Sequence, residues 1–134
     1  MDFYNHTKKL FANGEVTIAN LKTVLVNGYT FAPAETTLTN VTAAEVSGNG
    51  WTAGGEAIAN AAVTVTTTDD STLDGDDISV TATGGDIGPA DALVVVDATN
   101  NKPLFHYAFA SAQTAGDGTP FNVTWNASGI VTWS

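Results

Sequence analysis

The residues with the clearest potential for chemistry are five aspartates in the stretch TTDDSTLDGDDIS, residues 67–79. Closely spaced carboxylates can bind calcium, and Asp70, Asp74 and Asp76 have the spacing of the first, fifth and seventh positions of an EF-hand loop. The twelfth position, where that loop carries a bidentate glutamate, is Thr81 in this chain. The spacing therefore matches only the front half of a calcium loop.

The flanks of this acidic stretch help to decide between a metal site and a simple connection. AAVTVTTT before it and ISVTATGG after it are typical of strands, whereas an EF-hand needs helices on both sides. Exposed carboxylates tolerate one another because water and salt screen their repulsion. We expect a solvated loop between two strands, built around an Asp74-Gly75 turn, with no bound cofactor. The alternative is a calcium site of another kind, with Asp70, Asp74 and Asp76 as ligands.

Two histidines, His6 and His106, are the other candidates for catalysis or metal binding. Neither lies in a G-x-S-x-G, H-E-x-x-H or phosphate-loop motif, and the chain has no cysteine for a thiolate zinc site. Strand alternation in LFHYAF, residues 104–109, places His106 opposite the aromatic side chains, where we expect it to be partly exposed. We predict a protein without enzymatic activity.

The elements that must position these residues are short. β-rich runs separated by Gly, Asn and Asp clusters dominate the chain, which is typical of an all-β fold. We expect an antiparallel sandwich of about eight strands, jelly-roll-like or immunoglobulin-like. The run ALVVVD, residues 92–97, lacks polar alternation and predicts a central strand covered on both faces. The predicted strands are residues 15–19, 22–26, 57–67, 77–83, 92–97, 104–110, 121–125 and 130–133.

The length of 134 residues fits a single domain, and the charge restricts the partners that this domain can bind. Fourteen acidic residues against four lysines give a net charge of −10, which disfavours nucleic acid and anionic membranes. The longest apolar run, residues 92–96, is too short to cross a bilayer, and we see no signal peptide at the N-terminus. We therefore expect neither nucleic acid nor a membrane as a partner.

The first 13 residues differ from the rest, because they hold three aromatic residues and two of the four lysines. We divide the chain into an N-terminal arm, residues 1–13, and a single β-sandwich domain, residues 14–134. Aromatic side chains beside cations suit an interface, so we expect the arm to contact another subunit and a chain beginning at Asn13 to stay folded. The alternative is an edge strand or a short helix that closes the core. The residues predicted to make the contact are Phe3, Tyr4, Lys8, Lys9 and Phe11.

Trp51 lies between glycines in SGNGWTAGGEA, residues 47–57. A tryptophan in such a loop either plugs the end of a sandwich or anchors an interface. Both alternatives are open, and our prediction is that Trp51 is an interface residue. Trp125 shares a strand face with Phe121 and Val123, which favours a place in the core.

Three segments resemble a family of small virion structural proteins of tailed bacteriophages: FYNHTKKLFANG near the start, GNGWTAGGEAIAN in the middle and AGDGTPFNVTWNASGIVTW at the end. The likeness covers nearly the whole chain and is most specific in the end segments. It implies an accessory virion protein, which is either a decoration or cement protein on the capsid or a small tail or neck component. The family has no catalytic motif to transfer.

The resemblance implies a mechanical function. We expect a capsid decoration protein, made in the host cytoplasm and bound at the capsid surface of the virion. It would bridge subunits of the major capsid protein and contact copies of itself, with a trimer favoured. The first alternative is a tail, neck or fibre component that contacts a host glycan, and the second is a carbohydrate-binding module.

Overall fold

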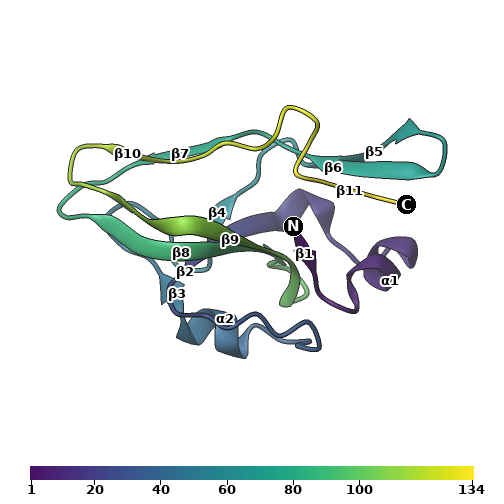
Figure 1. The fold of residues 1–134 in the computed structure, drawn as a ribbon, viewed down its shortest axis with the longest axis horizontal. Helices are drawn as coiled ribbons and strands as arrows, with labels where there is room; N and C mark the ends of the chain where they lie inside the picture. Colours follow the sequence, from purple (N-terminus) through teal and green to yellow (C-terminus); the bar gives the residue numbers. More distant parts are fainter.

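The chain folds as an antiparallel β-sandwich in the computed structural model, which describes residues 1–134 apart from the side chain of Thr67 (Figure 1). This confirms the predicted all-β class. The described chain has eleven strands rather than about eight, because three two-residue strands lie at the sheet edges and the acidic stretch adds another, while the strand predicted at residues 15–19 is absent. No helix of the described residues is long and apolar enough to span a membrane.

The larger sheet has the strand order β1-β9-β8-β2-β3, and β4 also pairs with β2. Every pairing in it is antiparallel. The long hairpin of β8 and β9 forms its centre. Its strands are β1 (Asp2–Phe3), β2 (Leu21–Val26), β3 (Glu45–Val46), β4 (Glu56–Ala57), β8 (Ile87–Asp97) and β9 (Lys102–Ala115).

The second layer lies above this sheet in Figure 1 and consists of two small sheets, β10-β7 and β11-β6-β5. β6 and β7 follow one another in the chain and pair with β11 and β10 respectively, so the two small sheets continue one another along the layer. The strands are β5 (Ala62–Thr67), β6 (Asp70–Asp74), β7 (Ile78–Thr81), β10 (Pro120–Val123) and β11 (Val131–Trp133).

The core has two parts, one on each face of the larger sheet. Leu93 and Val95 of β8 belong to the cluster between the two layers, whereas Val94 and Val96 belong to a second cluster on the opposite face. All four side chains are at most 2% exposed. The prediction of a central strand covered on both faces is therefore confirmed.

Residues 27–44, which include α2 (Thr39–Ala43), cover the face of the larger sheet that points away from the second layer. Phe31 of this segment stacks on His106 of β9, with ring centroids 4.8 Å apart and an angle of 14° between the planes. His106 is consequently 6% exposed, so the prediction of a partly exposed histidine was wrong. The alternation of side chains along the strand correctly placed His106 opposite the aromatic face of β9. It could not indicate that residues 27–44 cover the other face.

Residues 1–13 are attached to the same domain. β1 pairs with β9, and α1 (Thr7–Ala12) follows it. Tyr4 between them is 1% exposed. The whole chain exposes 6621 Å², which agrees with the roughly 6,600 Å² expected for a folded monomer of this mass. The predicted arm thus packs on its own chain, and its contact with another subunit stays a prediction.

Two sequence-based boundaries need correction. The acidic stretch is not a loop around Asp74-Gly75, because Asp70–Asp74 is strand β6 and the tight turn falls at residues 68–69. Asp69 has a φ of +68°, a conformation that Asp adopts more readily than most residues. Residues 15–19 are not a strand either; they run into the 3₁₀-helix Ile18–Asn20 before β2.

Candidate functional site

Four of the six predicted contact residues lie with Trp133 at a surface that we call the terminal face, formed by Phe3, Lys8, Lys9, Phe11 and Trp133. Trp133 of β11 lies 5.1 Å from Phe11 and 6.2 Å from Phe3, measured between ring centroids. All three rings are half-buried, while both lysines are exposed. Lys8 Nζ lies 5.4 Å from the centre of the Phe3 ring, which allows a cation–π contact. The two ends of the chain therefore build one aromatic and cationic surface.

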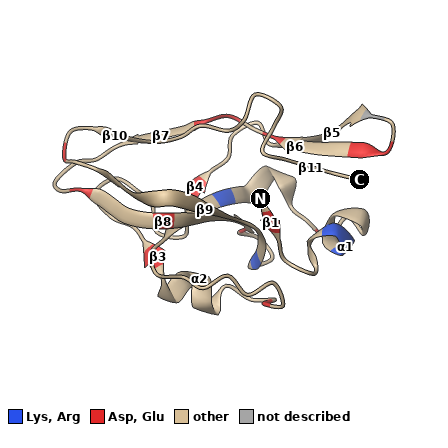
Figure 2. Cartoon of the chain, in the orientation of Figure 1, with Lys and Arg blue, Asp and Glu red and all other residues tan. Residues whose placement is uncertain are grey.

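The short helix α1 positions the lysines of this face. Thr7 points into the protein, where its hydroxyl donates to the Leu104 carbonyl at 2.7 Å, and Leu10 and Phe11 pack against the core. The helical period then leaves Lys8 and Lys9 on the solvent side. Gly14 ends the helix with a φ of +68°, the usual role of a glycine after the last helical turn. Both lysines belong to α1, which carries blue colour in Figure 2.

Two of the predicted interface residues lie elsewhere. Trp51 and Tyr4 are each 1% exposed within their own chain. Trp51 packs edge-on against Phe121, with ring centroids 5.5 Å apart. This burial corrects the interface prediction for both side chains, because neither has exposed surface left to bury against a partner. Trp51 is the plug of the sandwich, which was the alternative.

The backbone next to Trp51 explains this placement. Gly50 has a φ of +111°, and a side chain there would lie 2.9 Å from the carbonyl oxygen of Thr81 in β7. Only glycine permits this close approach of the loop to the upper layer. Gly48 and Trp51 also exchange backbone hydrogen bonds of 2.8 and 3.1 Å, which close the turn and direct the indole inward.

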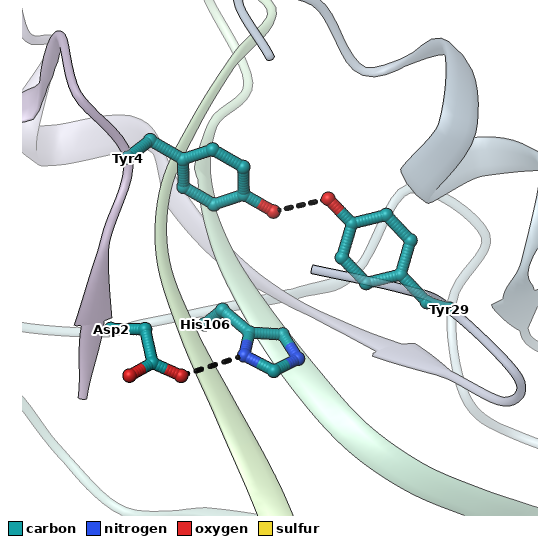
Figure 3. A network of polar contacts seen from close by, with 4 residues as sticks. All are labelled: Asp2, Tyr4, Tyr29 and His106. Atoms are coloured by element: carbon teal, nitrogen blue, oxygen red, sulfur yellow. Dashed lines mark hydrogen bonds and ion pairs between the residues drawn. The ribbon is translucent and has the colours of Figure 1, made fainter. Parts of the chain in front are cut away.

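A buried polar network joins the N-terminal segment to residues 27–44 (Figure 3). Tyr29 donates to the Glu35 carboxylate at 2.7 Å, so the 2.6 Å contact between the two phenols is a bond from Tyr4 to Tyr29. Burial raises the pKa of Tyr29 to about 12, and the neighbouring Glu35 carboxylate acts in the same direction. Burial also raises the pKa of Tyr4 above its usual range, reinforced by its bond to Tyr29. Both phenols therefore stay protonated at neutral pH.

The two histidines also help to attach the N-terminal segment to the rest of the domain. His106 Nδ1 lies 3.1 Å from the Asp2 carboxylate, and the His106 ring is 5.8 Å from that of Tyr29. His6 Nε2 donates to the Pro103 carbonyl at 2.6 Å. Each histidine thus binds a group of its own chain, and the network holds β1, β9 and the covering segment together.

The aspartates of the acidic stretch are spread along the upper layer. Asp76 accepts a hydrogen bond from the Asn60 side chain at 2.7 Å, and Asp77 accepts one from the Trp125 backbone N–H at 2.8 Å. Among the described residues no group of three His, Cys, Asp or Glu side chains is arranged to hold a metal ion. A calcium site formed by Asp70, Asp74 and Asp76 gains no support from this geometry.

A groove of about 670 Å³ lies between β9 and β10, and the sequence pattern did not indicate it. Its wall includes Tyr107, Phe109 and Trp125, of which Tyr107 is 48% exposed. Alternation did place Tyr107 and Phe109 on one face of their strand. It did not indicate that the upper layer leaves part of this face open.

Comparison with known proteins adds nothing to these observations, since no known family, no curated protein and no solved structure matches the chain.

Proposed function

We propose that the chain is a structural protein of a tailed-bacteriophage virion, and specifically a decoration protein that binds the capsid through the terminal face. Two arguments support this proposal, the resemblance of three sequence segments and the composition of the terminal face. The observation that carries it is the meeting of Phe3, Phe11 and Trp133 with two adjacent exposed lysines.

The terminal face has the chemistry of a docking surface. Half-buried aromatic rings gain stability when a partner covers them, and they are enriched in protein interfaces. The chain has only four lysines, and the other two, Lys22 and Lys102, are separate and half-buried. Lys8 and Lys9 therefore form the site at which an acidic patch of a capsid subunit would be bound.

The function would be mechanical. A stable interface covers about 800 Å² on each partner, which is roughly an eighth of the 6621 Å² that this chain exposes. Many such contacts across a capsid lattice reinforce one another, because each bound copy holds its neighbours at high effective concentration. A trimer over a threefold lattice point would suit this arrangement. Bridging copies would then resist the outward pressure of packaged DNA.

Copy number per particle tests the proposal. Gel densitometry of purified particles of the phage that encodes the chain, with the major capsid protein as the internal standard, gives this number. We expect on the order of hundreds of copies, as repeated lattice sites require. A few to tens of copies would point to a tail or neck component, and absence from the particle would refute a virion role.

A further inference from the structure

The groove between β9 and β10 has an unusual composition for this protein. It is about 670 Å³ in volume, and none of the side chains that line it is charged. The chain carries fourteen acidic residues and a net charge of −10, so a surface of this size without charged side chains is a distinct feature, although Met1 brings the N-terminal amino group to its edge. We propose that this groove binds a neutral saccharide.

β9 forms one wall of the groove, and its pairing with β8 is irregular there. β8 and β9 pair at Ala92–Ala108 and again at Ala90–Gln113, so one residue of β8 faces four residues of β9, 109–112. This bulge interrupts the regular row of backbone groups that an added peptide strand would need. The geometry thus favours a ligand recognised by side chains over a peptide that extends the sheet.

Aromatic side chains supply an apolar surface. The rings of Tyr107 and Phe109 lie 6.0 Å apart at an angle of 59°, and Tyr107 is one of two large apolar side chains that are exposed among those the structure describes. Trp125 lies on the opposite wall, where its indole Nε1 donates to the Asp76 carbonyl at 3.0 Å. The fixed indole and the Tyr107 side chain, which has only about two rotatable bonds, lose little entropy on binding, and the C–H face of a sugar ring packs well on such rings.

Side-chain amides supply the polar contacts. Gln113, Asn122 and Asn126 line the groove. The Asn126 Oδ1 accepts from the Ser128 N–H at 2.8 Å, and Gln113 Nε2 donates to the Ser111 carbonyl at 2.9 Å, which leaves one end of each amide for a ligand. In the described part of the chain the Asn122 side chain has no hydrogen-bond partner. An amide both donates and accepts, as a sugar hydroxyl does, so the two match without any charge.

The absence of charged side chains sets the ligand class. A cationic ligand would find no carboxylate in the groove. An anionic ligand would find the amino group of Met1 but no lysine side chain, and it would meet the field of a chain with a net charge of −10. A neutral ligand avoids both costs. This inference is independent of capsid attachment. On a particle, however, repeated copies would multiply a weak affinity for glycans.

The test is binding of the full chain to an array of neutral and sialylated oligosaccharides, followed by calorimetric titration of the best neutral hit. The variants are Tyr107→Ala and Asn122→Ala, and the matched control is Val65→Ala, an exposed apolar residue on β5 that is 79% exposed. We expect each groove variant to weaken binding by about tenfold or more, as the loss of a central contact does. The control should bind like the unmodified chain.

Three results would overturn the proposal. They are no binding to any neutral oligosaccharide, a preference for sialylated over neutral forms, or neutral binding that both groove variants leave unchanged. The melting temperature of each variant should stay near that of the unmodified chain, because Tyr107 and Asn122 are exposed. If one variant melts early, the other still decides the outcome.

Discussion

His106 Nδ1 and the Asp2 carboxylate lie 3.1 Å apart, which ties the first part of β9 to the first strand of the chain. Tyr4, two residues further on, is buried against residues 27–44 and bonds to Tyr29. These contacts make the N-terminal segment part of the fold, whatever it binds in addition.

The first prediction concerns a chain that begins at Asn13. The sequence led us to expect that this shortened chain stays folded, but the structure reverses that expectation. It should melt at a much lower temperature or fail to fold, because it lacks the buried Tyr4 ring and would expose apolar surface of β9. Removing a large core side chain alone costs about 3–5 kcal/mol. Thermal denaturation followed by circular dichroism measures the effect. The result would contradict the structure if the shortened chain melted within a few degrees of the full chain.

The second prediction concerns Trp51. Trp51→Ala should lower the free energy of unfolding by about 3–5 kcal/mol, because it leaves a cavity beside Phe121. Trp51→Phe should cost clearly less, since it keeps an aromatic ring and removes an indole N–H that has no partner among the described residues. Urea denaturation of both variants gives the comparison. Equal stability of Trp51→Ala and the unmodified chain would restore the interface interpretation.

The third prediction concerns alkaline pH. Unfolded tyrosine has a pKa of about 10, whereas the pKa of Tyr29 in the folded chain is raised to about 12. Above about pH 10 the unfolded chain therefore binds fewer protons than the folded chain, so stability falls as pH rises. The contribution is fully present below about pH 10 and is lost by about pH 12. The measurement is the free energy of unfolding between about pH 9 and pH 12, which should fall as the pH rises through this range.

The variant that isolates the two phenols is the double substitution Tyr4→Phe/Tyr29→Phe. It should be less stable at neutral pH because it loses both phenol bonds, and its stability should fall less steeply above about pH 10. If its decline is as steep as that of the unmodified chain, the buried phenols are not the cause.

The fourth prediction concerns metal removal. EDTA should leave the melting temperature unchanged, and so should Asp74→Asn, because Asp74 is an exposed residue at the end of β6. Calorimetric scans with added calcium and with EDTA compare the two states. A calcium-dependent rise of several degrees that Asp74→Asn abolishes would establish a metal site after all.

The fold class and the central strand were predictable because they depend on local periodicity. Val94 and Leu93 lie in a continuous apolar run, and such a run indicates burial on both faces. The acidic stretch was misassigned because its turn signal, Asp74-Gly75, is strong in isolation. Pairing with β5 and β11 outweighs that signal and makes Asp70–Asp74 a strand.

The candidate surfaces were predictable only in part. Composition identified Lys8 and Phe11 as unusual, but Trp133 joins them only because β11 returns the C-terminus to the N-terminal helix. Likewise, a Gly-rich loop is compatible with either an exposed or a buried Trp51. The choice depends on the close approach of Gly50 to β7, which is a tertiary contact.

The most direct test of capsid attachment is the occupancy of particles that lack the protein after addition of purified variants. Lys8→Ala/Lys9→Ala removes both exposed cations of the terminal face. Thr64→Glu/Ser79→Glu is the matched control, because it lowers the net charge by the same two units at exposed positions of β5 and β7. We predict that the unmodified chain and the control fill the lattice sites, whereas the affinity of the lysine variant is at least about tenfold lower. Equal occupancy by all three proteins, or no saturable binding of the unmodified chain, would contradict the account.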